Sequence, residues 1–173
     1  VINSYKYEDL PTFGMLRSRM YHNTWYRNCE YGFEMVDNGQ EPDPHMVAGN
    51  VLQNNVFAFN DPGGDGLALY LVSNIASDNR FTRNLLYGDR PGCKTVRYDW
   101  AWPGLDRWDG RRMSAEEANG QMPEQFSANL DADPLFASPE ADDYRLRTDS
   151  PCIDAAAPLA RATASGSGRE LPV

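Results

Sequence analysis

Asn23-Thr24-Trp25-Tyr26-Arg27-Asn28 is the first of three hexapeptides with the pattern Asn-x-(Trp/Phe)-x-x-Asn. The other two are Asn55-Val56-Phe57-Ala58-Phe59-Asn60 and Asn79-Arg80-Phe81-Thr82-Arg83-Asn84. They begin 32 and 24 residues apart, and each precedes a short apolar run typical of a β-strand, at 32–36, 66–71 and 95–98. Repetition at this spacing predicts a solenoid, in which each repeat forms one coil and packs on its neighbours.

The repeat predicts an all-β chain, a right-handed parallel β-helix of few coils. Strands of successive coils would lie about 4.8 Å apart, so that equivalent residues stack. We therefore expect an internal aromatic stack of Trp25, Phe57 and Phe81. Asn28, Asn60 and Asn84 would form a ladder at one bend, where asparagine tolerates the left-handed backbone that corners require. An Asn-rich β-sandwich with turns every ten residues or so is the alternative.

Further motifs carry a family resemblance. Two lie in the coils, Tyr21-His22-Asn23-Thr24-Trp25 and Gln53-Asn54-Asn55-Val56-Phe57, and three in the tail, Asp133-Pro134-Leu135-Phe136, Asp143-Tyr144-Arg145-Leu146 and Ser150-Pro151-Cys152-Ile153-Asp154-Ala155. Together they resemble the C-terminal part of right-handed parallel β-helix repeat proteins of the pectate-lyase-like superfamily. The resemblance implies the fold and a bacterial source. It leaves the activity open, since this superfamily includes lyases, hydrolases, epimerases and non-catalytic surface proteins.

The chain divides into four predicted segments. Residues 1–98 form the coils, 99–125 a Trp-rich loop and short helix inserted after them, 126–158 a C-terminal closing segment, and 159–173 a polar tail or linker. Ser114 and Glu117 fit a capping box at the start of the helix. No segment near residue 1 has the pattern of a cap, so we expect further coils of a longer chain, or a partner subunit, on that face.

Charge and composition exclude several classes of partner. The 173 residues include 16 Lys and Arg against 25 Asp and Glu, a net charge of −9. This charge disfavours nucleic acids and anionic membranes, and no apolar run is long enough for membrane insertion. The three cysteines have no disulfide or zinc-site spacing; three buried thiols are expected, with one disulfide and a free thiol as the alternative.

One candidate catalytic motif is Glu41-Pro42-Asp43-Pro44-His45. It resembles the Asp-Pro-His triplet of mannuronan C5-epimerases, in which the residues corresponding to Asp43 and His45 abstract and donate a proton at a sugar C5. Two departures weaken the match: Tyr31-Gly32-Phe33 lies ten residues too early, and the acidic residue expected one coil later is missing. A rigid turn with two prolines explains the motif equally well.

A second candidate site lies on the outward positions of the strands. Alignment of the three runs places Phe33, Leu67 and Val96 inward and Glu34, Ala68 and Arg97 outward, with Tyr70 and Asp99 sharing the next outward column. Resemblance to polysaccharide lyases implies a basic residue as the base and acidic residues with Ca²⁺, so Arg97, Lys94 and Asp99 could act beside His45. A solvated face with ordinary charges is the alternative.

Two loops supply further candidates. Trp100, Trp102 and Trp108 could form a carbohydrate platform, because indole faces stack on sugar rings; the alternative is that they fix the loop to the coils. Asp61 and Asp65 are weak candidates for binding Ca²⁺, and a plain turn is the alternative, because the ligand spacing of known calcium loops is missing.

These observations predict a secreted protein, extracellular or periplasmic, that binds or cleaves a polysaccharide as a lyase or hydrolase. The predicted catalytic residues are His45, Asp43 and Arg97. The predicted substrate-binding residues are Trp100, Trp102, Trp108, Tyr70, Lys94 and Asp99. The alternatives are a non-catalytic surface or adhesion solenoid or structural subunit, and epimerase-like chemistry at C5.

Overall fold

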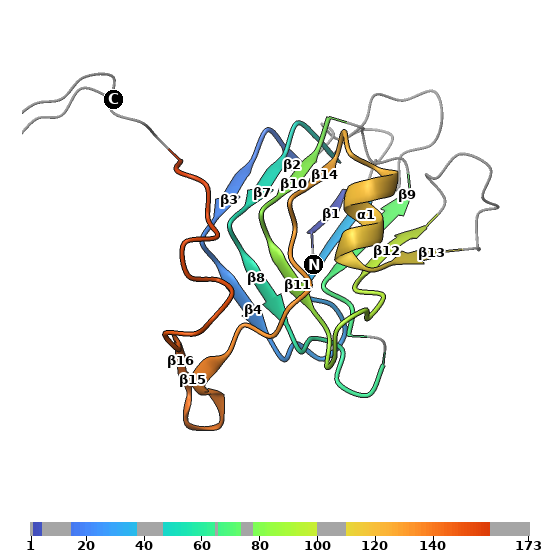
Figure 1. Cartoon of the computed structure of the whole chain (residues 1–173). Coiled ribbons are helices and arrows are strands. Elements are labelled where there is room, and N and C mark those ends of the chain that lie inside the picture. The colour runs from blue at the N-terminus through green and yellow to red at the C-terminus, as the bar shows by residue number, and fades with distance from the viewer. Residues whose placement is uncertain are drawn as a thin grey trace, which may run out of the picture.

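The structure is a computed structural model that describes residues 2–4, 15–37, 47–64, 66–73, 78–99 and 110–159. Within these ranges the protein is all-β with one short α-helix, and most strands lie in parallel sheets (Figure 1). The sequence prediction of an all-β chain built from parallel strands is therefore confirmed.

Three sheets dominate, and the strands of successive repeats lie side by side in each of them. Sheet A contains, in order, β1 (Ile2–Ser4), β5 (Phe33–Asp37), β9 (Leu69–Ser73), β12 (Val96–Asp99) and β13 (Arg111–Met113). Sheet C contains β3 (Arg19–Tyr21), β7 (Val51–Gln53), β10 (Arg80–Thr82) and β14 (Phe126–Ser127), and sheet D contains β4 (Thr24–Tyr26), β8 (Val56–Ala58) and β11 (Leu85–Tyr87). A small sheet B pairs β2 (Met15–Leu16) with β6 (Val47–Ala48). Only the β12–β13 pair in these four sheets is antiparallel.

The observed register corrects the predicted aromatic stack. Trp25 does lie over Phe57, with ring centroids 4.5 Å apart and planes 6° apart. Phe81, however, pairs with Leu52 in sheet C and stacks on Phe126 at 4.7 Å. The prediction failed because asparagines recur every five residues, at 50, 55 and 60. The third hexapeptide therefore fits residues 50–55 as well as residues 55–60, and in the structure Asn79 pairs with Asn50 and Asn84 with Asn55.

The same shift changes the predicted asparagine ladder. Asn28 and Asn60 do form one ladder, but Asn84 belongs to another. The described residues form three ladders, namely Asn50–Asn79, Asn28–Asn60 and Asn23–Asn55–Asn84–Asn129–Asn119. At a typical step Asn84 Nδ2 donates to the Leu52 carbonyl at 2.9 Å, and its Oδ1 accepts from the Asn55 backbone N–H at 3.1 Å. Each ladder therefore joins the corners of successive repeats.

The corners themselves have a two-residue pattern. One corner lies between the strands of sheet C and those of sheet D, at Asn23, Asn55, Asn84 and Asn129. The residue before each of these asparagines has a positive φ; these residues are His22, Asn54, Arg83 and Ala128. The ladder asparagines that follow do not. The left-handed backbone expected at the corners is thus present, but one position earlier than predicted, and the asparagine contributes through its side-chain hydrogen bonds.

The interior is filled by inward side chains stacked in columns. Phe33, Leu69, Val96 and Met113 form the column of sheet A, and Met20, Leu52, Phe81 and Phe126 that of sheet C. Most of them are fully buried. Such close packing of equivalent side chains contributes, with the ladders, to fixing the register.

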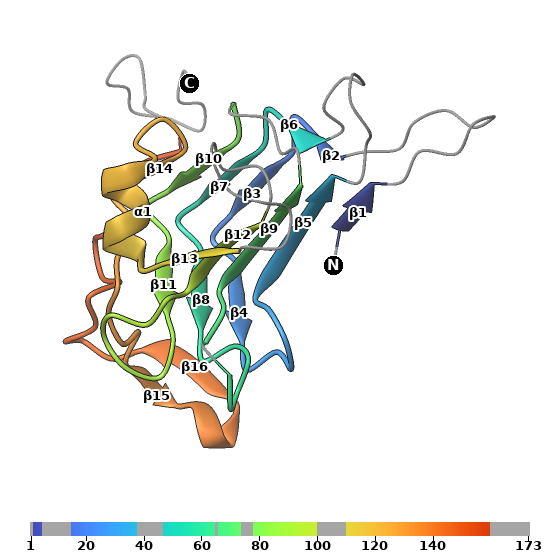
Figure 2. The same cartoon turned by 90° about the vertical axis from the view of Figure 1, so that its right-hand side faces the viewer.

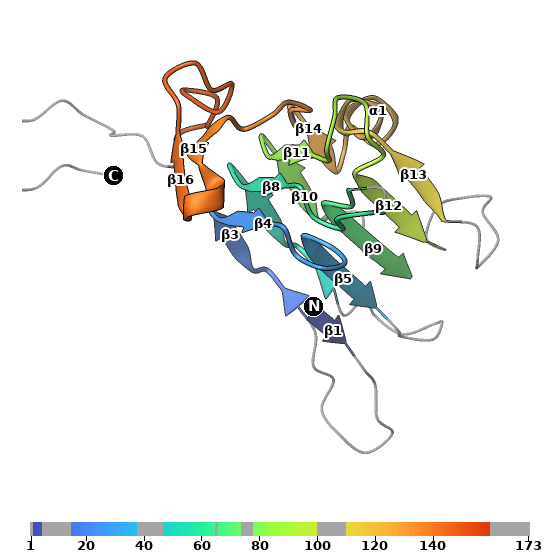
Figure 3. The same cartoon turned by 90° about the horizontal axis from the view of Figure 1, so that it is seen from below.

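Helix α1 (Ala115–Gln121) covers one end of the stack, opposite β1 (Figures 2 and 3). The predicted capping box is confirmed: the Glu117 N–H donates to Ser114 Oγ, and the Ser114 N–H donates to the Glu117 carboxylate. Ala115 and Ala118 are buried against the core. Asn119 ends the longest ladder, because its Oδ1 accepts from the Asn129 N–H and Nδ2.

Residues 126–158, the predicted closing segment, contribute β14 to sheet C and then run along the outside of sheet D. After β14 the segment forms an antiparallel pair of β15 (Phe136–Ser138) and β16 (Asp143–Leu146), joined by the 3₁₀-helix η1 (Pro139–Ala141). Phe136 packs edge-on against Tyr26 on the outside of sheet D, 5.6 Å between centroids. Farther on, the Ala157 backbone exchanges two hydrogen bonds with the Asn54 side chain. The end is covered by α1, from the segment predicted as an insertion.

Candidate functional site

The outer face of sheet A carries a column of polar side chains. Glu34, Tyr70 and Arg97 are paired in register across β5, β9 and β12, and Arg112 of β13 pairs with Arg97. Their neighbours in each strand point inward. The predicted columns are wrong by two residues in the second repeat. Ala68, which the alignment placed beside Glu34 and Arg97, is buried just before β9. Tyr70 occupies that outward position instead.

Asp99 ties the column together. Its Oδ2 accepts from the Tyr70 hydroxyl at 2.6 Å and lies 2.9 Å from Arg97 Nη2, while its Oδ1 accepts from Arg97 Nε at 3.0 Å. The Arg97 guanidinium also lies 4.8 Å from the centroid of the Tyr70 ring. Gly110 permits this arrangement, because a Cβ there would overlap the Asp99 carboxylate. We call these three residues, Tyr70, Arg97 and Asp99, the outer network.

Tyr70 and Arg97 both hold their protons at neutral pH. Burial and the hydrogen bond to Asp99 raise the pKa of Tyr70 well above its ordinary value. Burial alone would lower the pKa of Arg97, but the hydrogen bond to Asp99 and the nearby negative charge of Asp99 together outweigh burial, so the pKa is raised. Tyr70 is therefore a neutral hydroxyl and Arg97 a fixed cation, which makes them suitable for binding and poor as proton acceptors.

Two further residues extend the site toward the first repeat. The Tyr31 ring lies 4.6 Å from the Tyr70 ring, tilted by 50°. Burial, and then the nearby Glu30, raise the pKa of Glu34. Tyr31 and Glu34 line an open pocket of about 450 Å³, together with Trp25, Asn28, Cys29, Glu30 and Gly32. Paired aromatic rings beside fixed donors and acceptors form a surface that suits a sugar ring.

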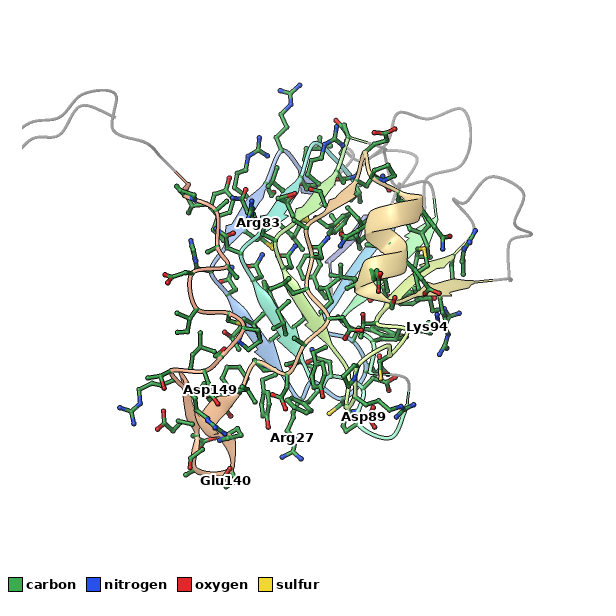
Figure 4. The ribbon with its side chains drawn as sticks, in the orientation of Figure 1. Arg27, Arg83, Asp89, Lys94, Glu140 and Asp149 are labelled. Carbon is green, nitrogen blue, oxygen red and sulfur yellow. The ribbon has the colours of Figure 1, made fainter. Side chains whose placement is uncertain are left out.

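The structure brings together some of the predicted residues and separates others. Tyr70, Arg97 and Asp99 meet, as described. Lys94, labelled in Figure 4, does not join them. Its ammonium pairs instead with Glu117 of α1 at 2.5 Å. The predicted residues Asp43, His45, Trp100, Trp102 and Trp108 lie outside the described residues. The sequence analysis missed Tyr31, which precedes its strand and so has no periodic signal, and passed over Glu34 although it occupied an outward position.

The candidate Ca²⁺ site is described only in part. Asp61 lies in a turn, where its carbonyl accepts from the Gly64 N–H at 3.0 Å, and Asp65 is outside the described residues. Among the residues that the structure describes, no three or more His, Cys, Asp or Glu side chains gather as metal ligands would. The cysteines are unpaired, and Cys29 is exposed rather than buried as expected.

No family model, curated protein or solved structure matches this chain. In the described part of the chain, no helix has the length and apolar character needed to cross a bilayer.

Proposed function

We propose that this chain forms a right-handed parallel β-helix of the pectate-lyase-like type and binds a polysaccharide on the outer face of sheet A. In-register parallel pairing of the repeats in sheets A, C and D supports the helix. Right-handedness follows from the strong preference of parallel strand connections for that hand. Repeated strands give an outer face with regular spacing, which suits a polymer.

The observation that carries the binding proposal is the outer network with Tyr31 and Glu34 beside it. Tyr70 and Arg97 are held by Asp99, so their positions are set before a ligand arrives, and little entropy is lost on binding. The aromatic rings offer apolar faces, and the charged groups offer hydrogen bonds to hydroxyls.

Charge narrows the class of polymer. The chain has a net charge of −9, which repels a densely anionic polysaccharide over distances of about 10 Å. Hydroxyl-rich neutral or weakly acidic polymers fit better. Binding such a polymer goes with a secreted protein, extracellular or periplasmic. We favour binding over cleavage, since neither Tyr70 nor Arg97 is suited to accept a proton; catalysis by Asp43 and His45 stays a prediction.

Affinity electrophoresis against neutral and acidic polysaccharides tests the proposal. We expect retardation by at least one neutral or weakly acidic polymer, and about tenfold weaker binding after Arg97→Ala, which releases Asp99 and Tyr70 as well. Lys94→Ala is the matched control, because it removes the same charge away from sheet A. Equal retardation of both variants, or no retardation of the unmodified protein by any polymer, would contradict the proposal.

The same polymers distinguish binding from cleavage. Incubation with the bound polysaccharide, followed by assays for new reducing ends and for the absorbance of unsaturated products, should show no turnover. Turnover that disappears in His45→Ala would instead support the enzyme alternative, and turnover that survives in that variant would remove His45 as its catalytic residue.

A further inference from the structure

A second pocket, of about 210 Å³, lies at the corner that leads from sheet D to sheet A. Arg27, Phe59 and Gly88 directly follow β4, β8 and β11, so they hold equivalent places in three successive repeats. These three residues line the pocket, which we call the corner pocket, together with Asp61, Gly66 and Asp89 among others. It therefore lies between described repeats, and it shares no described lining residue with the pocket of the polysaccharide site.

Glycines keep the corner pocket open. A Cβ on Gly66 would lie 2.6 Å from the Gly88 Cα, and a Cβ on Gly88 would lie 2.6 Å from Cys93 Sγ. Gly66 also has a φ of +70°, a left-handed value that favours glycine. A larger residue at either position would push the corners of the second and third repeats apart.

The asparagine ladder of this corner stops at the pocket. Asn28 and Asn60 are joined by a hydrogen bond of 3.0 Å, whereas the equivalent residue of the third repeat is Asp89. The Asp89 carboxylate pairs with Arg90 at 2.7 Å, so it adds no net charge to the pocket. A repeat that breaks its own pattern beside an open pocket is typical of a functional site.

Opposite charges line the corner pocket. The Arg27 side chain is exposed, and its guanidinium lies 5.8 Å from the centroid of the Tyr26 ring without an ion pair to any described residue. Asp61 is held in its turn, because its N–H donates to the Asn28 carbonyl at 2.9 Å and its carbonyl accepts from the Gly64 N–H at 3.0 Å. Its carboxylate packs against Gly64, where a Cβ would overlap it.

Phe59 supplies an apolar wall. Its ring packs edge-on against Tyr26 and Tyr87, with centroids 5.6 and 5.3 Å away, so its position is set before a ligand arrives. The corner pocket is smaller than the roughly 300 Å³ at which pockets for drug-sized ligands begin. It therefore suits one small molecule and not a polymer.

We propose that the corner pocket binds a free amino acid with an apolar side chain. The carboxylate of this ligand would bind the Arg27 guanidinium, its ammonium the Asp61 carboxylate, and its side chain the Phe59 ring. A simple anion would be repelled by Asp61 and a simple cation by Arg27, so the two charges select a ligand that carries both. The proposal concerns residues outside the polysaccharide site and does not depend on polysaccharide binding.

L-leucine is a suitable probe, with leucinamide and 4-methylpentanoate as analogues that lack its carboxylate and its ammonium. Titration of the full chain by NMR should show saturable shifts of the Gly63 and Gly64 amides with leucine. Each analogue should bind about fivefold more weakly, the effect of one exposed ion pair. Arg27→Ala should make leucine and leucinamide bind alike, and Asp61→Asn should do so for leucine and 4-methylpentanoate.

Arg83→Ala is the matched control, because it removes an exposed guanidinium far from Arg27 (Figure 4), and its affinity for leucine should be unchanged. Should Asp61→Asn fail to fold, the comparison of leucine with 4-methylpentanoate on the unmodified protein still decides. The proposal would be overturned by no saturable shift up to the solubility limit of leucine, or by an analogue that binds as tightly as leucine. Equal loss of affinity in Arg27→Ala and Arg83→Ala would also overturn it.

Discussion

The asparagine ladders and the outer network are both sets of hydrogen-bonded polar side chains, yet they occupy opposite surroundings. The ladder asparagines lie at equivalent corners of successive repeats, and Asn50, Asn79 and Asn84 are fully buried. Tyr70 and Arg97 are only partly buried, and their arrangement with Asp99 occurs once. Polar groups that recur inside therefore specify the register of the repeats, whereas a polar group that occurs once outside marks a surface for a ligand.

The two sets also differ in what their loss should cost. A buried hydrogen-bonding group that loses its partner cannot turn to water, and its desolvation is uncompensated. A half-exposed group can exchange its partner for water at little cost. Substitutions in the ladders should therefore change stability, and substitutions in the outer network should change binding.

The largest effect is expected from Asn84→Ala. The change leaves the Leu52 carbonyl, the Asn55 N–H and the Asn129 side-chain oxygen without their partner in the ladder, so the free energy of unfolding should fall by about 3 kcal/mol. Urea denaturation measures it. Asn28→Ala is the matched control, with an expected change within about 0.5 kcal/mol; similar losses in both variants would mean that burial of the ladder does not matter.

A smaller loss is expected from Asn119→Ala, which removes the end of the longest ladder. It leaves the Asn129 N–H unpaired at the α1 end, and we expect a loss of about 1.5 kcal/mol in urea denaturation. Glu116→Ala, an exposed change in the same helix, serves as the control for helix propensity. An Asn119→Ala protein as stable as this control would show that α1 does not close the ladder.

Tyr70→Phe should affect stability mainly at high pH. Near neutral pH we expect a loss of about 1 kcal/mol, for one hydrogen bond. Because the pKa of Tyr70 is raised in the folded protein above its ordinary value of 10.0, the unfolded chain releases this proton first above that pH, and the free energy of unfolding falls as pH rises. The phenylalanine variant should fall less steeply in denaturation series from pH 9 to 11. An unchanged slope would contradict the assignment.

The smallest effect is expected from Lys94→Ala. The side chains of Lys94 and Glu117 are 46% and 40% exposed, so solvent screens their ion pair and it should contribute less than about 1 kcal/mol. Glu117 also completes the capping box and keeps that role in the variant. Thermal unfolding in low and high salt measures the change, which should vanish as salt rises; a loss that persists in high salt would mean that Lys94 is structural.

Much of the fold could be predicted from the repeat, because strand residues, corners and capping boxes are local patterns. Trp25 over Phe57 and the helix that follows Ser114 were predicted correctly for this reason. The pairing of Phe81 was not, because asparagines at five-residue spacing allow two alignments of similar quality. Only the packing of whole repeats, with offsets of 32 and 29 residues, selects between them.

The candidate site was less predictable. Tyr70, Arg97 and Asp99 were named from their positions near the strands, but their mutual hydrogen bonds depend on a register that the sequence does not determine by itself. Lys94 was included because it is near Arg97 in sequence, whereas the corner before β12 directs it toward α1. Tyr31 belongs to the site only through its ring contact with Tyr70 of the next repeat, which no local sequence pattern predicts.

The most direct test of the central claim, that the ladders hold the fold while the outer network binds a polymer, is the dissociation constant of the bound polysaccharide for Tyr70→Phe at pH 7. We predict at least fivefold weaker binding, because the ligand loses the Tyr70 hydroxyl and Asp99 loses the hydrogen bond that it accepts from it. An affinity equal to that of the unmodified protein would contradict a role for the outer network in binding.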